Sequence, residues 1–347
     1  MTKSNEVSTF SVKTLVDNII SSLEKERERE IISRRFGLYD RKETLEQIGE
    51  MLGITRERVR QLEKIIINQL SNSNQKQFVN NISKFDDFVM PTLTERGNLI
   101  RVSDLAQVIC ENANKIDNSR VSFLAKLSSQ LELVEEDDAF YSFIYVKKSM
   151  NEKDIKSSVG NIIEKIKDVN EPQSVDQLAK LINNQNKSQI SSLASISKNL
   201  TSLNGLWGLV RWPSVNPKNI RDKIYVVLKE NGKHMHFNEI AEKIRNSDFK
   251  RNDVTTQAIH NELIKDKRFV LIGRGLYALK EWGYKKGTVS DIITEILKEA
   301  SQPLHKDEIV KKVLENRYVK ETTVILNLQG KPQFKRVAKA TYELSED

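Results

Sequence analysis

A short apolar and acidic pattern recurs four times along the chain, and this repetition limits the folds that the sequence can adopt. The copies are VSDLAQVI from Val102, SVDQLAKLI from Ser174, HFNEIAEKI from His236 and HKDEIVKKV from His305, at intervals of roughly 60 to 75 residues. In each copy the apolar residues recur at helical spacing, and a second helical segment follows. Such intervals favour a series of small domains over one large core.

Every copy closes on two short segments rich in aromatic and branched residues. These segments are LVEEDDAFYSFIYV from Leu133, SLNGLWGLVRW from Ser202, RFVLIGRGLYALKEW from Arg268 and FKRVAKATYELS from Phe334. Helices followed by a two-stranded hairpin predict a winged helix, in which the hairpin is the wing. The predicted fold class is therefore mainly α with small β-hairpin wings, arranged as about four winged-helix-like repeats.

Three further helices are predicted ahead of the repeats. The first ends at Gly37, where a residue free to take positive φ can cap it. Thr44 and Gln47 form a capping box for the second, which Gly53 ends, and Thr55 caps the third. Two helices joined by a short glycine-containing turn predict a helix-turn-helix, whose second helix enters the major groove of DNA. The inward-facing residues of the three helices are predicted to be Leu23, Ile31, Ile32, Phe36, Leu45, Ile48, Leu52, Val59, Leu62 and Ile66.

The outward face of the third helix carries side chains that suit base reading. Arg56 can bridge the O6 and N7 atoms of guanine, Glu57 can accept from the N4 amine of cytosine, and Gln61 can pair with adenine. Phosphates would repel an exposed glutamate on such a helix unless it contacts a base. The alternative interpretation is that this face, which also carries Arg60, is solvated and stabilised by weak ion pairs.

The sequence TLEQIGEMLGITRERVRQLE from Thr44 resembles the region 4 helix-turn-helix of the sigma-70 family almost residue for residue, and IISRRFGL resembles the helix that leads into it. By this resemblance, which covers about 50 of the 347 residues, the third helix would read a minus-35 promoter element. The implied base-reading residues are Arg56, Glu57 and Gln61. The implied backbone or flanking contacts are Thr44, Leu45, Thr55, Arg58, Arg60 and Lys64. Only 22 residues precede the resemblance, where the family's promoter-melting region would lie, so we expect that the chain does not open a promoter alone.

The third copy is the clearest of the four and the most basic. Residues 218–286 hold 16 basic and 9 acidic residues, nearly all of the chain's net charge of +8. They resemble a HARE-type winged helix, a family that includes a module of the RNA polymerase delta subunit. A layout of cations around a helix and wing suits phosphates on either side of a groove. The predicted second DNA surface comprises Lys250, Arg251, Thr255, Thr256, Gln257, Lys265, Lys267, Arg268 and Arg274. A solvated basic surface or a docking site for an acidic partner stays open as the alternative.

The first copy has the opposite charge at its wing. Its tip holds Glu135, Glu136, Asp137 and Asp138, which phosphates would repel, so we expect this wing to contact protein. The expected domains follow from these patterns. They are an N-terminal helix or tail at 1–22, a helix-turn-helix at 23–72 with a polar linker at Ser71–Gln77, winged-helix-like repeats at 80–150 and 154–215, the HARE-type winged helix at 218–286, and a last repeat at 288–347.

Several other classes of protein are not favoured. The single cysteine permits no disulfide within one chain, and no zinc-finger spacing of cysteine and histidine is present. No phosphate-binding glycine loop, nucleophile elbow or paired catalytic carboxylate motif is present. We therefore expect no metal, no cofactor and no enzymatic activity. The start lacks the layout of a secretory signal, and no apolar run is long enough to cross a bilayer, so we expect a cytoplasmic, nucleoid-associated protein.

Three functional hypotheses remain. The chain is a sequence-specific transcription regulator that binds double-stranded DNA and acts with bacterial RNA polymerase, or an accessory protein that docks on the polymerase as the delta subunit does, or the targeting component of a DNA-modification or defence system. The candidate base-reading residues favour the first.

Overall fold

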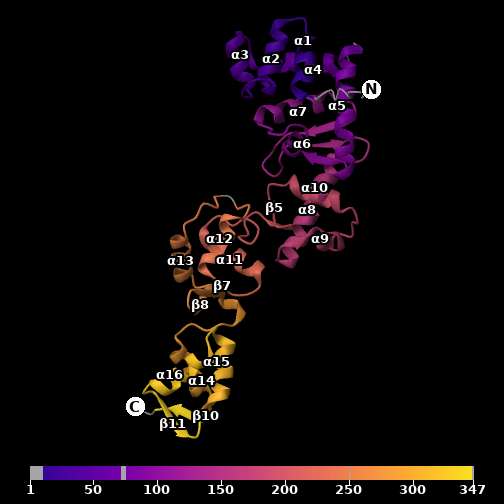
Figure 1. Ribbon diagram of the computed structural model, residues 1–347. Helices are drawn as coiled ribbons and strands as arrows, with labels where there is room; N and C mark the ends of the chain where they lie inside the picture. The colour runs from indigo at the N-terminus through magenta and orange to yellow at the C-terminus, as the bar shows by residue number, and fades with distance from the viewer. Residues whose placement is uncertain (1–10, 72–75, 250, 346–347) are drawn as a thin grey trace, which may run out of the picture. The chain divides into compact units, whose positions relative to one another are not determined.

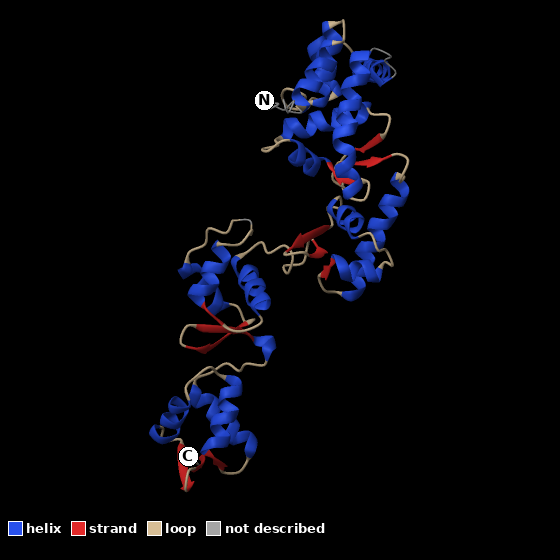
Figure 2. Cartoon of the chain, turned by 45° about the vertical axis from the view of Figure 1, so that its right-hand side comes forward, coloured by secondary structure: helices blue, strands red, loops and turns tan. Residues whose placement is uncertain are grey.

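The computed structural model describes residues 11–71, 76–249 and 251–345. The chain divides into two compact units, Met1–Arg211 and Trp212–Asp347. Helices predominate in both, and the strands form small antiparallel sheets of three strands each (Figure 1, Figure 2). This confirms the prediction of a mainly helical fold with small β-elements. None of the described helices is long and apolar enough to cross a membrane.

The first unit opens with helices α1 (Val12–Ser21), α2 (Glu26–Phe36), α3 (Leu45–Leu52) and α4 (Arg56–Ser71). The predicted capping box is present, because the Thr44 hydroxyl accepts from the Gln47 backbone N–H and the Gln47 side chain accepts from the Thr44 N–H. Gly37 and Gly53 end α2 and α3 at a φ of 64°, a conformation that glycine adopts without steric cost. The first helix was predicted to contain Leu23, which is wrong: Leu23 lies buried in the turn between α1 and α2.

After α4 the order helix, strand, helix, helix, strand, strand occurs four times in the described residues, and we number these stretches repeats 1 to 4. Most of the polar linker predicted at Ser71–Gln77 lies outside the described residues. Repeat 1 comprises α5 (Lys76–Glu95), β1 (Leu99–Arg101), α6 (Val102–Ile109), α7 (Lys115–Leu127), β2 (Leu131–Val134) and β3 (Phe143–Val146). Repeat 2 comprises α8 (Glu152–Val169), β4 (Gln173–Ser174), α9 (Val175–Leu181), α10 (Lys187–Ser195), β5 (Leu200–Leu203) and β6 (Leu206–Leu209).

The second unit holds the other two repeats. Repeat 3 comprises α11 (Ile220–Asn231), β7 (Met235–His236), α12 (Phe237–Arg245), α13 (Thr256–Lys265), β8 (Phe269–Gly273) and β9 (Leu276–Leu279), followed by the 3-10 helix η1 (Lys280–Trp282). Repeat 4 comprises α14 (Val289–Ala300), β10 (Leu304–His305), α15 (Lys306–Asn316), α16 (Glu321–Gly330), β11 (Phe334–Ala338) and β12 (Thr341–Leu344).

Each repeat has one strand more than the predicted hairpin. The last strand is central in every sheet, in the orders β1-β3-β2, β4-β6-β5, β7-β9-β8 and β10-β12-β11. The additional strand is very short and runs directly into a helix. In repeat 3, for example, His236 pairs with Leu276 of β9, and its Nδ1 accepts from the Asn238 N–H to cap α12. An alternation of apolar and polar residues cannot be recognised over two positions, so the sequence pattern did not reveal these strands.

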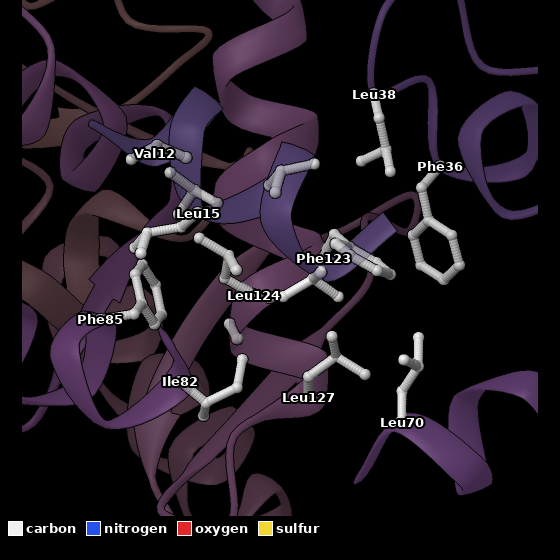
Figure 3. Close-up of a cluster of buried hydrophobic side chains, with 14 of the residues drawn as sticks. Val12, Leu15, Phe36, Leu38, Leu70, Ile82, Phe85, Phe123, Leu124 and Leu127 are labelled. Carbon is white, nitrogen blue, oxygen red and sulfur yellow. The ribbon is translucent and has the colours of Figure 1, made fainter. Parts of the chain in front are cut away.

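One hydrophobic core joins the N-terminal helices to repeat 1. Buried residues from α1, α2, α4, α5 and α7 form a single cluster, part of which is shown in Figure 3. Within it the rings of Phe36 in α2 and Phe123 in α7 lie 5.1 Å apart between centroids. Polar contacts add to this packing, because Arg120 Nε of α7 donates to the Leu38 carbonyl at 2.9 Å and the Tyr39 hydroxyl to Asp17 at 2.7 Å. The apolar side of α2 and α4 is therefore covered by the same chain.

The loop between β2 and β3, which carries the acidic wing tip, contacts repeat 2. The Tyr141 N–H donates to the Ile196 carbonyl, and the Lys198 N–H donates to the Ala139 carbonyl. Lys198 also pairs with Glu136 at 2.6 Å. A Cβ on Gly97 would lie 2.5 Å from the Gln189 Cβ, so the two repeats approach closely. These bonds lie within the chain, and the expectation that this wing contacts another protein stays a prediction.

Repeats 3 and 4 are also joined by backbone contacts. The Tyr318 N–H donates to the Ile272 carbonyl of β8 at 3.0 Å, and Arg317 Nη1 donates to the Leu271 carbonyl at 3.0 Å. The Tyr318 ring lies 4.7 Å from that of His234. The segment between α15 and α16 thereby covers part of the edge of β8, and a covered edge is protected from pairing with another chain.

Candidate nucleic-acid interface

Helices α3 and α4 are held together by a close approach at one glycine. Gly49 is buried in α3, and a Cβ at this position would lie 2.7 Å from the Ile54 carbonyl oxygen. The turn between the helices therefore leaves no room for a side chain at position 49. The Thr55 hydroxyl accepts from the Arg58 N–H at 3.2 Å, as its predicted capping role requires. Val59 and Ile66 are buried on the inner side of α4, which fixes its outward face.

The three predicted base-reading residues all lie on that outward face. Arg56, Glu57 and Gln61 are exposed. Arg60 binds both carboxylate oxygens of Glu57, at 2.7 and 2.8 Å, and the Gln61 side chain donates to Glu57 at 3.3 Å. The hydrogen bonds from Arg60, more than the one from Gln61 or the charge of Arg56, lower the pKa of Glu57 to about 2. The carboxylate is therefore ionised throughout the neutral range.

Arg56 has a different partner, which the sequence interpretation did not include. Its Nη1 lies 3.2 Å from Oε1 of Glu46 on α3, and both side chains are exposed. Exposed pairs of this kind contribute little to stability and are readily exchanged for another partner.

The predicted backbone-contact residues fall into two groups. The hydroxyls of Thr44 and Thr55 cap helices, and Leu45 packs partly buried against the core. Arg58, Arg60 and Lys64 are exposed along α4. Arg58 donates to Gln61 at 3.4 Å, so Arg58, Gln61, Glu57 and Arg60 form one run of hydrogen bonds.

Repeat 1 contributes a cation beside α4 that sequence reasoning missed. Lys126 of α7 lines a cavity of about 240 Å³ with Arg60, Lys64 and other residues of α4. The Lys126 ammonium lies 5.3 Å from the centre of the Phe36 ring and 3.6 Å from Glu135. No local motif could reveal this position, because α7 follows α4 by more than forty residues in the sequence.

The helix-turn-helix is similar in sequence to a known family and to several known proteins. Residues 22–72 match the family model of sigma-70, region 4. This region 4 segment is similar to RNA polymerase sigma factor sigB of Arabidopsis thaliana, with 44% identity over 61 residues that make up 17% of this chain and 10% of the relative. It is also similar to RNA polymerase sigma factor SigA of Microcystis aeruginosa, with 35% identity over 79 residues, 22% of this chain and 19% of the relative.

A third relative is also a sigma factor. RNA polymerase sigma factor RpoD of Helicobacter pylori (strain ATCC 700392 / 26695) is 39% identical over 72 residues, which are 20% of this chain and 11% of that protein. The chain thus spans less than a fifth of the length of each of these relatives. The comparisons confirm the resemblance to region 4.

The predicted second surface lies on repeat 3. Lys250 falls outside the described residues, whereas Arg251, Lys265, Lys267 and Arg274 are exposed. Three polar residues near the start of α13 are hydrogen-bonded within the repeat. The Thr255 hydroxyl caps the helix, Thr256 accepts from Arg245 at 3.4 Å, and Gln257 donates to Asn261 at 3.1 Å.

Arg268 differs from the other cations of this surface. Its guanidinium binds Asp266 at 2.7 Å and Asp222 of α11 at 3.1 Å. The hydrogen bonds that Arg268 donates to Asp266 are the main cause of a raised pKa at Arg268. Burial raises the pKa of Asp266, but the hydrogen bonds from Arg268 outweigh it and the net pKa is lowered. In this arrangement the side chain links β8 to α11 rather than extending into solvent, while the predicted phosphate contact stays a prediction.

Proposed function

We propose that this chain is a sequence-specific DNA-binding regulator of transcription initiation that reads a minus-35-type promoter element. The observation that carries the proposal is the exposed set Arg56, Glu57 and Gln61 on the second helix of a segment that matches sigma-70, region 4. The chain would recognise the promoter sequence, and the proposal does not include the full role of a sigma factor.

The contacts on α4 suggest how binding would proceed. In the free protein Arg60 neutralises the Glu57 carboxylate. In the major groove, Arg60 would exchange this partner for a phosphate, and Glu57 would accept from the N4 amine of a cytosine. Arg56 would likewise leave Glu46 for the O6 and N7 atoms of a guanine. Because both ion pairs are exposed, little stability is lost in either exchange.

The four repeats act in this proposal as winged helices, with repeat 3 as a second DNA contact. The support is the order of their elements and the exposed cations Lys265, Lys267 and Arg274 at the end of α13 and at the wing. Phosphate contacts of this kind would add affinity without sequence preference. We include in the proposal that the chain is a binding protein and not an enzyme.

A selection from a random duplex library with the full chain tests the base-reading role. We expect enrichment of one short element resembling a minus-35 sequence. Replacing Glu57 with alanine should relax the preference at one base pair, whereas replacing Lys265 should weaken binding to all sequences alike. A selection that enriches no element with the unaltered chain would refute the proposal.

Docking on RNA polymerase is the second candidate, because all three of the relatives described are RNA polymerase sigma factors. Co-purification of the chain with core polymerase at high salt and without DNA would support it. Salt weakens contacts that DNA would mediate, so a complex that persists would reflect a direct protein interface. Loss of all association after nuclease treatment would argue for DNA binding alone.

A further inference from the structure

The charges of repeat 4 are separated between its two halves. Residues 289–316, which include α14 and α15, hold six acidic and four basic residues. Residues 317–345, which include α16 and the β11–β12 hairpin, hold six basic and two acidic residues. The repeat as a whole is close to neutral, so its net charge gives no indication of this polarity.

Four of these cations cluster at the hairpin. Lys331, Lys335, Arg336 and Lys339, which we call the wing cations, are all exposed. Within the described residues the ion pairs of repeat 4 and the segment before it involve Lys285, His305, Lys306 and Lys312, and none involves a wing cation. Lys335 lies opposite Glu343 in the register of the two strands. The pKa of Asp291 is lowered mainly by hydrogen bonds from Thr288, and the charge of Lys331 adds a smaller contribution.

The backbone of the hairpin is irregular beside Arg336. The register of β11 and β12 shifts between Arg336 and Ala338, so the hairpin has a bulge at Val337, which is 42% exposed. A bulge changes the direction in which side chains point. Arg336 Nε donates to the Ala338 carbonyl at 3.2 Å, which positions its guanidinium at the tip of the hairpin.

The helix that precedes the hairpin carries only one charge that would oppose a polyanion, in its first turn. Beyond Glu321 in its first turn, α16 contains no acidic residue. Its exposed positions include Thr322, Thr323 and Gln329, and Leu326 is 67% exposed. Beyond the first turn phosphates could approach this helix without repulsion from its own side chains, and the threonine and glutamine side chains could donate to them.

The hairpins of repeats 1 and 2 differ from this one in charge. In repeat 1 the tip is acidic, and Lys156 and Lys198 of the same chain pair with Asp137 and Glu136. In repeat 2 the turn is Asn204-Gly205 and is uncharged. The wing of repeat 4 is the reverse of the first, since its cations have no ion-pair partner among the described residues.

We propose that α16 and the β11–β12 hairpin form a sequence-independent contact surface for the sugar-phosphate backbone of duplex DNA. Cations outside ion pairs can bind phosphates without first breaking such a pair, and each contact releases counterions from the duplex. The choice of DNA over another polyanion rests on the proposed function of the region 4 segment. The surface lies in the other unit of the chain, so it would add affinity to an element selected elsewhere.

The test compares two double variants of the full chain that remove the same charge. Lys335→Gln with Lys339→Gln alters the wing, and Lys298→Gln with Lys311→Gln alters exposed lysines of α14 and α15 that also lie outside the ion pairs of the described residues. Affinity for a 30-base-pair duplex of random sequence is measured over a series of salt concentrations. The wing variant should reduce the slope of log K against log salt by about 0.9 for each lost phosphate contact, or about 1.8 in all. The control should leave the slope unchanged.

The outcomes separate this inference from the proposed function. Equal changes in both variants would reflect net charge alone and would overturn the inference, as would no change in either. Tighter, wing-dependent binding to poly-glutamate than to the duplex would identify an acidic protein as the partner and would also overturn it. Because the random duplex contains no selected element, a shallower slope with the wing variant supports the surface even if no element is found. A selected element with an unaltered slope would refute the surface alone.

Discussion

Glu57 can form two kinds of contact, and they compete for the same two carboxylate oxygens. In the free protein both carboxylate oxygens are bound by Arg60, and Gln61 donates to one of them. A cytosine amine would need one of those oxygens. The ion pair with Arg60 thus balances the negative charge of the carboxylate until a base is present. Because the pair is exposed, exchanging it for another partner costs little free energy.

The pKa of Glu57 provides a direct measurement of this arrangement. We expect its carboxyl to titrate near a pKa of about 2 in the free chain, so the ion pair persists from neutral pH to well below the ordinary value and is lost only as the pH falls through the lowered one. Arg60→Gln should raise the pKa toward that ordinary value. Carbon NMR of the side-chain carboxyl gives the titration curve.

Arg58→Gln is the matched control for this titration, since Arg58 bonds to Gln61 and not to Glu57. It should leave the pKa of Glu57 nearly unchanged. An ordinary pKa for Glu57 in the unaltered chain would contradict the arrangement of α4 described above.

Arg268 allows a second distinction at the level of one residue. Replacing it with alanine leaves Asp266 and Asp222 without their cation, and we expect a loss of about 1 to 2 kcal/mol, since hydrogen bonds to charged groups contribute more than neutral ones and solvent screens a side chain that is 37% exposed. Hydrogen exchange in α11 and β8 should show reduced protection.

The pH dependence of the Arg268→Ala effect has a definite sign. Because the pKa of Asp266 is lowered in the folded chain, its pairing with Arg268 stabilises the fold above the ordinary carboxyl pKa and is lost as the pH falls through the lowered value. The difference between the variant and the unaltered chain should therefore shrink in acid. Lys267→Ala, at an exposed position, should leave exchange unaffected. Unchanged protection in Arg268→Ala together with weaker DNA binding would instead make Arg268 a phosphate contact.

At the scale of elements, the helix-turn-helix depends on the missing side chain of Gly49. In Gly49→Ala the new Cβ would meet the Ile54 carbonyl at 2.7 Å, and the backbone between α3 and α4 would have to move. We expect a loss of about 1 to 3 kcal/mol, as for other overpacked sites, with faster hydrogen exchange in α3 and weaker discrimination between DNA sequences.

Gly160→Ala in α8 serves as the control for Gly49→Ala. Gly160 is a helical glycine with no atom near the position of an added Cβ. Alanine there should be neutral or stabilising by up to about 1 kcal/mol, because glycine is the poorer helix former. Equal stability of the two alanine variants would show that the turn tolerates a side chain at Gly49.

Features written in local sequence could be predicted, and features created by distant contacts could not. The caps at Thr44 and Thr55 and the end of α3 at Gly53 depend on neighbours within four residues, and all are present. The requirement for glycine at position 49 and the placement of Lys126 beside α4 depend on tertiary packing. Likewise, the sequence around Arg268 predicts a DNA contact, but an aspartate 46 residues away binds its guanidinium.

At the scale of the molecule, the region 4 segment does not have a core of its own. Its buried residues belong to one cluster with α1, α5 and α7, which lie outside the part that matches the family model. Repeating helical patterns identified the four later repeats but could not show that the first of them shares its core with the helix-turn-helix. That sharing fixes α4 against repeat 1, so changes in the repeat should affect how α4 meets DNA.

Two fragments test this dependence. A fragment of residues 22–72 would expose side chains such as Phe36, which is buried against Phe123 of α7 in the full chain, and each such side chain loses about 1.5 to 3 kcal/mol of burial. A segment of this size has little stability to lose. We expect it to show weak helical circular dichroism, a broad melt and binding of a hydrophobic dye, whereas residues 11–149 should melt cooperatively.

Phe123→Ala in the longer fragment should lower its stability by about 3 to 5 kcal/mol. It should also speed hydrogen exchange in α2, because the rings of Phe123 and Phe36 lie 5.1 Å apart between centroids. If residues 22–72 melt as sharply as the longer fragment, the shared core is dispensable and the helix-turn-helix folds independently of repeat 1.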